Sequence, residues 1–367
     1  MRIGILGGGQ LGRMLALAGY PLGLSFRFLD PSPEACAGQV GELVVRDFLD
    51  EEALRRFAEG LELVTYEFEN VPVEAVRFLA GRLPIYPPPQ ALAVAQDRLR
   101  EKAFMQSLGV PTPPFHPVET LEDLKVGLEA TGLPALLKTR RGGYDGKNQI
   151  LIRREEEAER AFWALGGRGL LLEGYVAFDR EVALLSVRGQ GGEVVFYPLV
   201  ENRHQGGILR LSLAPAPGVS EALQRKAEDY ARRALMALDY TGVLALEFFQ
   251  VGEELLFNEM APRVHNSGHW TLEGAETSQF ENHLRALLGL PLGSTAPRGY
   301  SAMVNLIGLR PDFGEVLRLK GAHLHWYGKA VRPGRKVGHI TLRQDRWEGL
   351  EEALPRLVAL AQVPVGP

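Results

Sequence analysis

The first 95 residues alternate short apolar runs with amphipathic segments, and this alternation limits the possible folds more than any other feature of the sequence. The runs "RIGILG" (2–7), "SFRFLD" (25–30) and "LELVTYEFEN" (61–70) have the composition of strands. The segments 10–23 and 50–60 have helical patterns and end in glycine. Strands separated by helices of this length form a parallel, doubly wound sheet. We predict such a domain over residues 1–95, with the proline-rich stretch 83–90 as its linker.

The remainder of the chain changes character near residue 180. A chain of 367 residues normally divides into two or three domains. We expect one long helix at 91–109, strands at 135–139, 149–154 and 169–176, and an acidic helix near 155–165. Beyond residue 181 the pattern is mainly β to about 260, with a helix at 219–238, a helical segment at 275–289 and a mixed tail. The fold class is therefore α/β combined with α+β, with a small central domain over 96–180 and a larger mixed domain over 181–367.

Bulk properties exclude several classes of partner. The formal net charge of −4 gives no electrostatic case for a nucleic-acid or membrane-surface partner. No apolar run approaches the roughly 20 residues of a membrane span. Cys36 is the single cysteine, so no internal disulfide and no cysteine metal site can form. A reducing cytoplasm is the expected location.

A glycine-rich turn follows the first strand. Residues Gly7 to Gly12 fit the pattern G-x-G-x-x-G between a strand and a helix, and Asp30 ends the next strand. A helix N-terminus offers free N–H groups to a phosphate, and the spacing also fits a dinucleotide fingerprint. The simpler interpretation is that the glycines only permit a tight turn. We expect phosphate binding here, without knowing which phosphate.

The segment "KTRRGGYDGKNQI" (138–150) follows an apolar run and forms a cationic, glycine-rich flap. Consecutive glycines hold one conformation only at an entropic cost, so we expect the loop to be mobile without ligand. Glycine N–H groups, with Lys138 and Lys147, suit phosphate oxygens. A mobile basic cover is typical of phosphoryl-transfer enzymes. The alternative is a solvated basic hairpin.

The hairpin "GVLALEFFQVGEELLFNEMA" (242–261) places two carboxylates opposite each other. With a three-residue turn, 252–254, Val251 faces Leu255 and Glu247 faces Glu259. Like charges in this position repel, and a divalent cation such as Mg²⁺ removes the conflict. Asn258 adds a neutral oxygen. Apolar neighbours argue against the alternative, an exposed acidic hairpin.

Two further polar segments lie towards the C-terminus. "MAPRVHNSGHWT" (260–271) suggests an anion-binding turn; a zinc site on His265 and His269 is an alternative without an obvious third ligand. A cationic run contains Lys329, Arg332, Arg335, Lys336 and His339. This run is either a solvated tail or a second phosphate clamp.

Together these motifs resemble the ATP-grasp enzymes, and the finer ones resemble the 5-(carboxyamino)imidazole ribonucleotide synthases over almost the whole chain. The segments that carry the resemblance are "GGGQLGRML", "TYEFENV", "DRLREK", "GGYDGKNQ", "YPLVENRHQGGILR", "APRVHNSGHWT" and "GRKVGHI". The resemblance implies an N-terminal Rossmann-like domain that binds the ribonucleotide, a central ATP-grasp lid and a C-terminal ATP-grasp domain with a metal site. It also implies a homodimer.

The resemblance assigns roles to individual residues. For ATP it implies Arg98, Lys138, Gly143, Tyr144, Asp145, Gly146, Lys147, Asn148, Gln149, Glu173, Gly174, Tyr175, Val176, Glu181, His204, Asn258 and Glu259. For 5-aminoimidazole ribonucleotide it implies Gly9, Gln10, Leu11, Glu67, Asn70, Arg263, His265, Asn266, Ser267, Lys329, Arg335 and Lys336. Mg²⁺, or Mn²⁺, would be held by Glu247 and Glu259. Catalytic roles would fall to Lys138, Tyr144, Asp145, Arg263 and His265.

The implied reaction activates bicarbonate as carboxyphosphate, which the ribonucleotide amine then attacks, with no covalent enzyme intermediate and no biotin. Two departures from the family pattern bear on the fit. Asn148 stands where the flap usually ends in glycine, and Asn tolerates a left-handed backbone better than most residues. Gly174 lies in the adenine hinge. The remaining alternatives are an NAD-dependent dehydrogenase, another ATP-grasp ligase such as a formate-dependent ribonucleotide formyltransferase, and a nucleotide-binding regulator without turnover.

Overall fold

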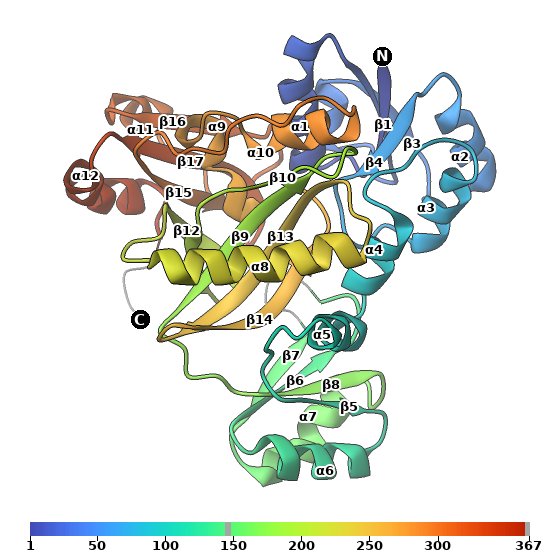
Figure 1. Ribbon diagram of the computed structural model, residues 1–367, viewed down its shortest axis with the longest axis vertical. Helices are drawn as coiled ribbons and strands as arrows, with labels where there is room; N and C mark the ends of the chain where they lie inside the picture. Colours follow the sequence, from blue (N-terminus) through green and yellow to red (C-terminus); the bar gives the residue numbers. More distant parts are fainter. Residues whose placement is uncertain (144–147, 364–367) are drawn as a thin grey trace.

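Three β-sheets organise the chain (Figure 1). The computed structural model describes residues 1–143 and 148–363. The N-terminal sheet lies at the upper right of Figure 1, the small central sheet lies below it, and the large sheet fills the middle and left. None of the helices in the described part of the chain combines the length and the apolar character that a membrane crossing needs.

The N-terminal sheet is parallel with strand order β3-β2-β1-β4, as predicted for a doubly wound sheet. Its strands are β1 (Arg2–Leu6), β2 (Ser25–Asp30), β3 (Glu42–Val45) and β4 (Leu63–Tyr66). Its helices are α1 (Gln10–Gly19), α2 (Glu51–Ala58) and α3 (Val73–Ala80). The chain order reverses between β1 and β4, so the loops after these two strands meet at one end of the sheet, where ligands bind in such folds.

The single helix predicted at 91–109 is wrong, because the structure contains two. Helix α4 (Pro89–Ala95) ends before Gln96, and α5 (Arg98–Ser107) begins after Asp97. The Asp97 carboxylate accepts the backbone N–H groups of Leu99 and Arg100 at 3.0 and 3.4 Å. Aspartate favours this capping position, and it therefore starts a new helix here. The break directs α5 towards the outer edge of the large sheet.

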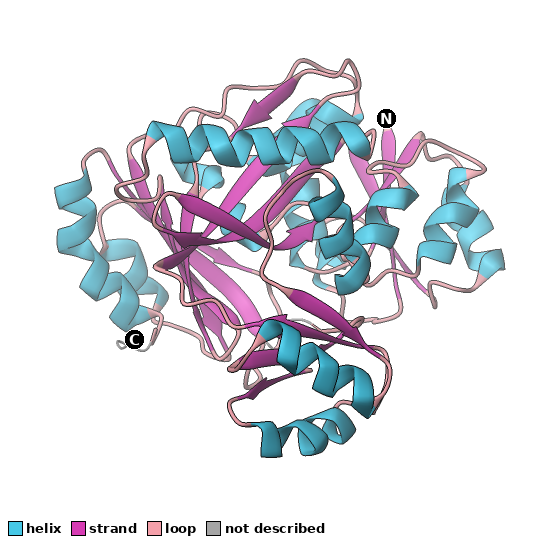
Figure 2. Cartoon of the chain, turned by 60° about the horizontal axis from the view of Figure 1, so that its bottom comes forward, coloured by secondary structure: helices cyan, strands magenta, loops and turns pink. Residues whose placement is uncertain are grey.

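The central sheet is antiparallel with order β5-β8-β6-β7. Its strands are β5 (Phe115–Val118), β6 (Ala135–Thr139), β7 (Gln149–Ile152) and β8 (Leu170–Gly174). Helices α6 (Leu121–Thr131) and α7 (Ala158–Ala164) lie together on one side of this sheet, as Figure 2 shows at the bottom. The flap connects β6 to β7, so it leaves the sheet directly at Lys138 and Thr139.

The large sheet has nine antiparallel strands, with β14 at one edge and β16 at the other. Its strands are β9 (Arg180–Arg188), β10 (Val194–Phe196), β11 (Val200–Gln205), β12 (Ile208–Ala214), β13 (Gly242–Val251), β14 (Glu254–Ala261), β15 (Tyr300–Ile307), β16 (Ala322–Trp326) and β17 (Lys336–Gln344). Its helices are α8 (Glu221–Ala237), α9 (Thr271–Gly274), α10 (Gln279–Leu287), α11 (Phe313–Arg318) and α12 (Trp347–Leu360). Helix α8 crosses one face of the sheet (Figures 1 and 2). Helix α12 was not predicted.

Candidate active site

Glu247 and Glu259 are direct cross-strand partners on β13 and β14, which confirms the predicted pairing. The predicted turn, however, is wrong. Val251 pairs with Glu254, so the turn has two residues, and a bulge follows where the register shifts between Glu247 and Phe248. The extra residue of a bulge moves the register by one position. The shorter turn and the bulge compensate, so the two carboxylates still face each other.

The two carboxylates have opposite electrostatic environments. Burial alone would raise the pKa of Glu247, but His265 and the nearby His204 lower it to about 2. Glu259 is exposed to solvent, yet the protein packed around it and the Glu247 charge raise its pKa. A like charge directly opposite disfavours ionisation. The hairpin therefore holds one ionised carboxylate, Glu247, and a second, Glu259, whose ionisation is disfavoured by burial and by the Glu247 charge.

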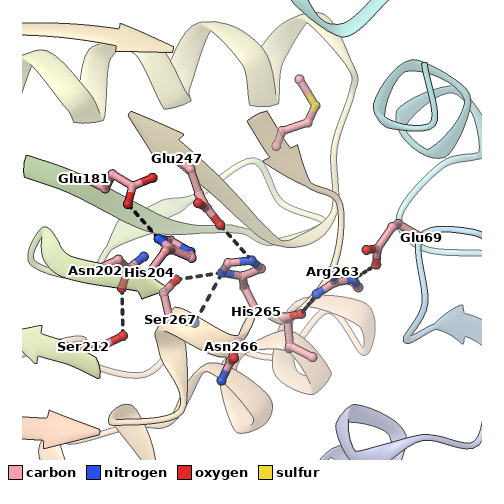
Figure 3. Close-up of polar contacts among 12 residues, drawn as sticks. Glu69, Glu181, Asn202, His204, Ser212, Glu247, Arg263, His265, Asn266 and Ser267 are labelled. Carbon is pink, nitrogen blue, oxygen red and sulfur yellow. Dashed lines mark hydrogen bonds and ion pairs between the residues drawn. The ribbon is translucent and has the colours of Figure 1, made fainter. Parts of the chain in front are cut away.

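His265 is fixed as a donor to Glu247 (Figure 3). Its Nδ1 accepts the backbone N–H of Ser267 at 3.3 Å and lies 2.7 Å from the Ser267 hydroxyl. Because Nδ1 is an acceptor, the ring proton sits on Nε2, which lies 3.1 Å from Glu247 Oε1. The predicted neighbours His265, Ser267 and Glu247 are thus brought together.

The two glutamates suit Mg²⁺, which binds one or two carboxylates and completes its coordination with phosphate oxygens and water. Within residues 1–143 and 148–363, no group of three or more His, Cys, Asp or Glu side chains is placed to hold a metal ion. The zinc alternative on His265 and His269 therefore finds no support there. His269 is buried against the rings of Phe280 and His339 instead.

Three charged side chains form a buried group between the small and large sheets. Lys138 Nζ lies 2.9 Å from Glu173 Oε2, and Lys102 Nζ lies 3.4 Å from Glu173 Oε1. Burial alone would raise the pKa of Glu173, but the two lysines lower it to about 2. Lys138 and Glu173 were both predicted site residues. Lys102 was not, although it lies in the motif "DRLREK".

Glu101, the neighbour of Lys102, was also missed. It is 2% exposed, and its carboxylate accepts the backbone N–H of Met260 on β14. Burial and the Glu259 charge raise the pKa of Glu101 to about 8. Two consecutive charged residues usually mark a solvent-facing helix surface, so nothing in the local sequence reveals that both are buried.

The root of the flap is anchored on α5. Arg98 donates to the carbonyls of Thr139 and Gly143, both at 3.3 Å. Asn148 adopts a positive φ of 60°, which confirms that asparagine occupies the left-handed position at the end of the flap. The charges of Arg98 and Lys138 also act on Glu259, where they lower its pKa against burial and Glu247. The predicted residues Tyr144, Asp145, Gly146 and Lys147 lie outside the described residues.

Three backbone N–H groups of the glycine turn have acceptors within the protein. Gly8 N–H donates to Asp30 at 2.8 Å, and the N–H groups of Gly9 and Gly12 donate to Glu67 at 3.0 and 3.2 Å. Two carboxylates of the protein thus accept these three N–H groups, and phosphate binding at the turn stays a prediction. Burial raises the pKa of Glu67, and the two glycine N–H groups partly offset this.

The C-terminal cations reach the same turn. Lys329 Nζ donates to the side-chain oxygen of Gln10 at 3.0 Å, and burial lowers the pKa of Lys329. Lys336 is the first residue of β17 and Arg335 directly precedes it, while Arg332 pairs with Glu34 at 3.6 Å. His339 is buried in a stack with His325 and does not belong to a surface clamp.

Arg263 joins the large sheet to the loop after β4. It forms an ion pair with Glu69, a residue that the sequence analysis missed (Figure 3). Beside this loop, Asn70 lines a cavity of about 250 Å³ together with Gln96, Arg141 and Gly142. A larger hollow of about 370 Å³ lies between Phe196, Val219 and Pro297, away from the residues described above.

The other predicted residues take ordinary positions nearby. His204 Nδ1 lies 2.8 Å from Glu181, so the two predicted nucleotide residues are in contact (Figure 3). Asn266 and Asn305 exchange two amide hydrogen bonds. Tyr175, after β8, is half exposed. Leu11 is buried in α1, Gln149 starts β7, Gly174 ends β8, and Val176 and Asn258 are half-buried.

Three family models match the chain in succession. They are the ribonucleotide synthetase preATP-grasp domain over residues 1–96, the ATP-grasp domain over 103–280 and the phosphoribosylaminoimidazole carboxylase C-terminal domain over 301–353. The N5-carboxyaminoimidazole ribonucleotide synthase of Pseudomonas aeruginosa is 55% identical over 362 residues, which cover 99% of this chain and 100% of that protein. The chain belongs to this family.

Solved structures of N5-carboxyaminoimidazole ribonucleotide synthases have the same fold. The crystal structure of the Thermus thermophilus synthetase is 78% identical, has a TM-score of 0.97 and covers 100% of both chains. The Aspergillus clavatus synthase, solved in complex with ADP and 5-aminoimidazole ribonucleotide, is 33% identical, has a TM-score of 0.91 and covers 98% of each chain. The chain is therefore an ATP-grasp ligase of the N5-carboxyaminoimidazole ribonucleotide synthase type, and the dehydrogenase alternative is wrong.

Proposed function

We propose that this chain uses ATP to join bicarbonate to the exocyclic amine of 5-aminoimidazole ribonucleotide, in de novo purine synthesis. The observation that carries the proposal is the Glu247–Glu259 pair, together with the charges of Arg98 and Lys138, which act on Glu259. Carboxylates and cations around one point suit a metal–triphosphate group. The Aspergillus clavatus relative, solved with ADP and the ribonucleotide, supports both substrates.

In this proposal ATP lies between the central and large sheets. Arg98 and Lys138 meet the phosphates, the segment 173–176 borders the adenine, and Glu181, oriented by His204, binds the ribose. The flap residues 143–149 cover the phosphates. Lys138 is paired with Glu173, so it reaches a phosphate by exchanging one anion for another, which keeps its buried charge neutralised.

Glu247 and Glu259 would hold Mg²⁺, or Mn²⁺, with Asn258 beside them. When bound, the ion supplies positive charge that offsets the phosphate oxygens. His265 would then release or share Glu247, since the two side chains are in contact. A bound cation would relieve the repulsion between Glu259 and Glu247.

The ribonucleotide would lie at the carboxyl end of the N-terminal sheet. Gly9, Gln10, Leu11, Glu67 and Asn70 line this position, and Lys329, Arg335 and Lys336 would bind its phosphate. The Lys329–Gln10 bond supports this arrangement, because it brings the cationic run to the glycine turn. Arg263, His265, Asn266 and Ser267 would lie between the two substrates.

The chemistry divides into two transfers. Bicarbonate oxygen attacks the γ-phosphorus of ATP, which releases ADP and forms carboxyphosphate. The ribonucleotide amine then attacks the carboxyl carbon, which releases phosphate and leaves a carbamate. The protein contributes positioning and positive charge, from Arg98, Lys138 and Arg263, with Tyr144 and Asp145 proposed for the flap.

Phosphate release from ATP tests the reaction. We expect release to require the ribonucleotide and bicarbonate together, and to leave the carbamate as product. Equal release with formate in place of bicarbonate would instead identify a formyl-transferring ligase. ATP hydrolysis that ignores both co-substrates would contradict the proposal.

Four further expectations concern the domains, the oligomeric state, the location and the partners of the protein. We propose domains over 1–95, 96–180 and 181–367, a homodimer, a cytoplasmic location, and no nucleic-acid or membrane partner. The lone, buried Cys36 and the small net charge support the location and the absence of such partners. Light scattering of the purified protein tests the dimer.

A further inference from the structure

The outer edge of β14 is covered by side chains of α5 on both sides of Glu259. Lys102 Nζ donates to the carbonyl of Asn258 at 2.9 Å, and Glu101 accepts the N–H of Met260. These two backbone groups belong to the residues directly before and after Glu259. Both side chains are buried, with 1% exposure for Lys102 and 2% for Glu101.

The position of β14 explains why these partners matter. It is the edge strand of the large sheet, so its outward backbone groups have no neighbouring strand. The bulge opposite Glu247 and Phe248 further interrupts the ladder at this point. A buried backbone group without a partner costs free energy comparable to a lost hydrogen bond. Glu101 and Lys102 supply the acceptor and the donor that a further strand would otherwise provide.

Lys102 has a second partner on another sheet. Its Nζ lies 3.4 Å from Glu173 Oε1, while Lys138 holds the other oxygen of the same carboxylate. One ammonium group thus touches β14, which carries Glu259, and β8, which carries Glu173. Lys102 therefore links the two strands through one buried ammonium group.

We propose that Glu101 and Lys102 are positioning residues that fix the backbone around Glu259 and, through Lys102, set its distance from the Lys138–Glu173 pair. This inference rests on the nucleotide and metal roles proposed above, and it adds two buried residues to them. Residues that orient metal ligands commonly contribute about 10- to 100-fold in affinity or activity.

Lys102→Met is the primary test, since it keeps the chain length and removes the donor. We expect the dissociation constant for MgADP to rise about 10- to 100-fold. We also expect the fold-decrease in kcat to be larger than the fold-change in KM for the ribonucleotide. Lys226→Met is the matched control. Lys226 also donates from a helix to a carbonyl and a carboxylate of this hairpin, Glu253 and Glu254, but at its tip. We expect the control to bind MgADP within about twofold of wild type.

A second pair of variants tests the Glu101 contact even if Lys102→Met fails to fold. Glu101→Gln keeps an acceptor for Met260 N–H, whereas Glu101→Ala removes it. We expect Glu101→Ala to speed hydrogen exchange over residues 257–261 and to weaken MgADP binding. Glu101→Gln should restore most of both.

Two results would overturn the inference. One is a dissociation constant for MgADP in Lys102→Met that equals the wild-type value. An equally large rise of this constant in Lys226→Met would count in the same way. The other is unchanged exchange at 257–261 in Glu101→Ala. Neither measurement uses the ribonucleotide or bicarbonate, so a wild-type protein without carboxylation activity would contradict the proposed function and leave this test intact.

Discussion

The glycine turn after β1 and the β13–β14 hairpin are both places where the chain gathers charge, but they resolve it differently. At the turn, Asp30 and Glu67 accept the backbone N–H groups of Gly8, Gly9 and Gly12. At the hairpin, Glu247 and Glu259 face each other, and the nearest basic group, His265, bonds to Glu247. At the turn the glycine N–H groups partly offset the effect of burial on the pKa of Glu67, whereas at the hairpin the Glu247 charge adds to the effect of burial on the pKa of Glu259.

This difference shows why a pair of facing carboxylates predicts a ligand site better than a glycine pattern does. A glycine turn provides donors, and any carboxylate of the same chain can use them. The repulsion between two carboxylates that face each other across a strand pair can be relieved only by a proton, a basic side chain or a cation. An unresolved charge conflict therefore indicates a ligand more strongly than a set of free donors does.

The largest expected effect comes from the hairpin. Glu259→Gln keeps the shape of the side chain and removes the opposed charge. We expect turnover at saturating MgATP to fall about a hundred- to thousand-fold, as for other lost electrostatic contacts to a transition state. Without metal, the thermal midpoint should stay the same or rise slightly, since the repulsion with Glu247 is gone.

Glu254→Gln is the control for this prediction, because Glu254 lies on the same strand at the exposed tip. We expect it to leave turnover nearly unchanged. Near-normal turnover in Glu259→Gln would remove the hairpin from the active site. A lowered midpoint in that variant would show that the two carboxylates do not oppose each other.

A smaller effect, on stability, should come from the ion pair between His204 and Glu181 in the same region. Burial alone would lower the pKa of His204, but Glu181 and Glu247 raise it to about 9. Because the folded value lies above the unfolded value of about 6.5, the pair stabilises the fold fully below pH about 6.5. This stabilisation, on the order of 3 kcal/mol, is lost as the pH rises through about 9.

Urea unfolding at several pH values checks this prediction. The free energy of unfolding of the wild type should fall between pH about 6.5 and about 9, and His204→Asn should flatten that decline. If His204→Asn shows the same decline as wild type, another group is responsible.

The smallest of these effects is expected at the glycine turn. A methyl group on Gly9 would lie 3.0 Å from both oxygens of Glu67, so Gly9→Ala must displace that carboxylate. We expect KM for the ribonucleotide to rise about tenfold, since small misplacements near a substrate are costly, with KM for ATP unchanged. Gly81→Ala, where the added methyl group meets only the Phe78 carbonyl at 3.7 Å, is the control. A rise in KM for ATP instead would reverse the roles of the two regions.

The sequence predicted the pairing of Glu247 with Glu259 but not the connections around it. The Glu247–Glu259 pairing is right because two one-residue errors compensate: the turn is shorter than predicted, and the bulge was not foreseen. Neither is encoded in the alternation of apolar residues, since a bulge depends on how the strand bends against its neighbours. Strands β1, β2 and β4 of the N-terminal sheet follow directly from local composition.

Elements that depend on tertiary contacts could not be predicted. Strand β3 is short and only partly buried, and α12 contains Pro355, which weakens a helical pattern. The break at Asp97 required a choice between a helix interior and a cap, which local sequence leaves open. Glu69, Glu101 and Lys102 have their partners 194, 159 and 156 residues away, beyond any local pattern.

The cover that α5 places over β14 also limits self-association. An uncovered edge strand is a template onto which a strand of another molecule can add, and this is a common start of aggregation. On β14 the Phe257 N–H is taken by the Pro111 carbonyl, and the groups around Glu259 are taken by Lys102 and Glu101. The same contacts that hold a proposed metal ligand in place therefore protect this edge of the large sheet from intermolecular β-sheet growth.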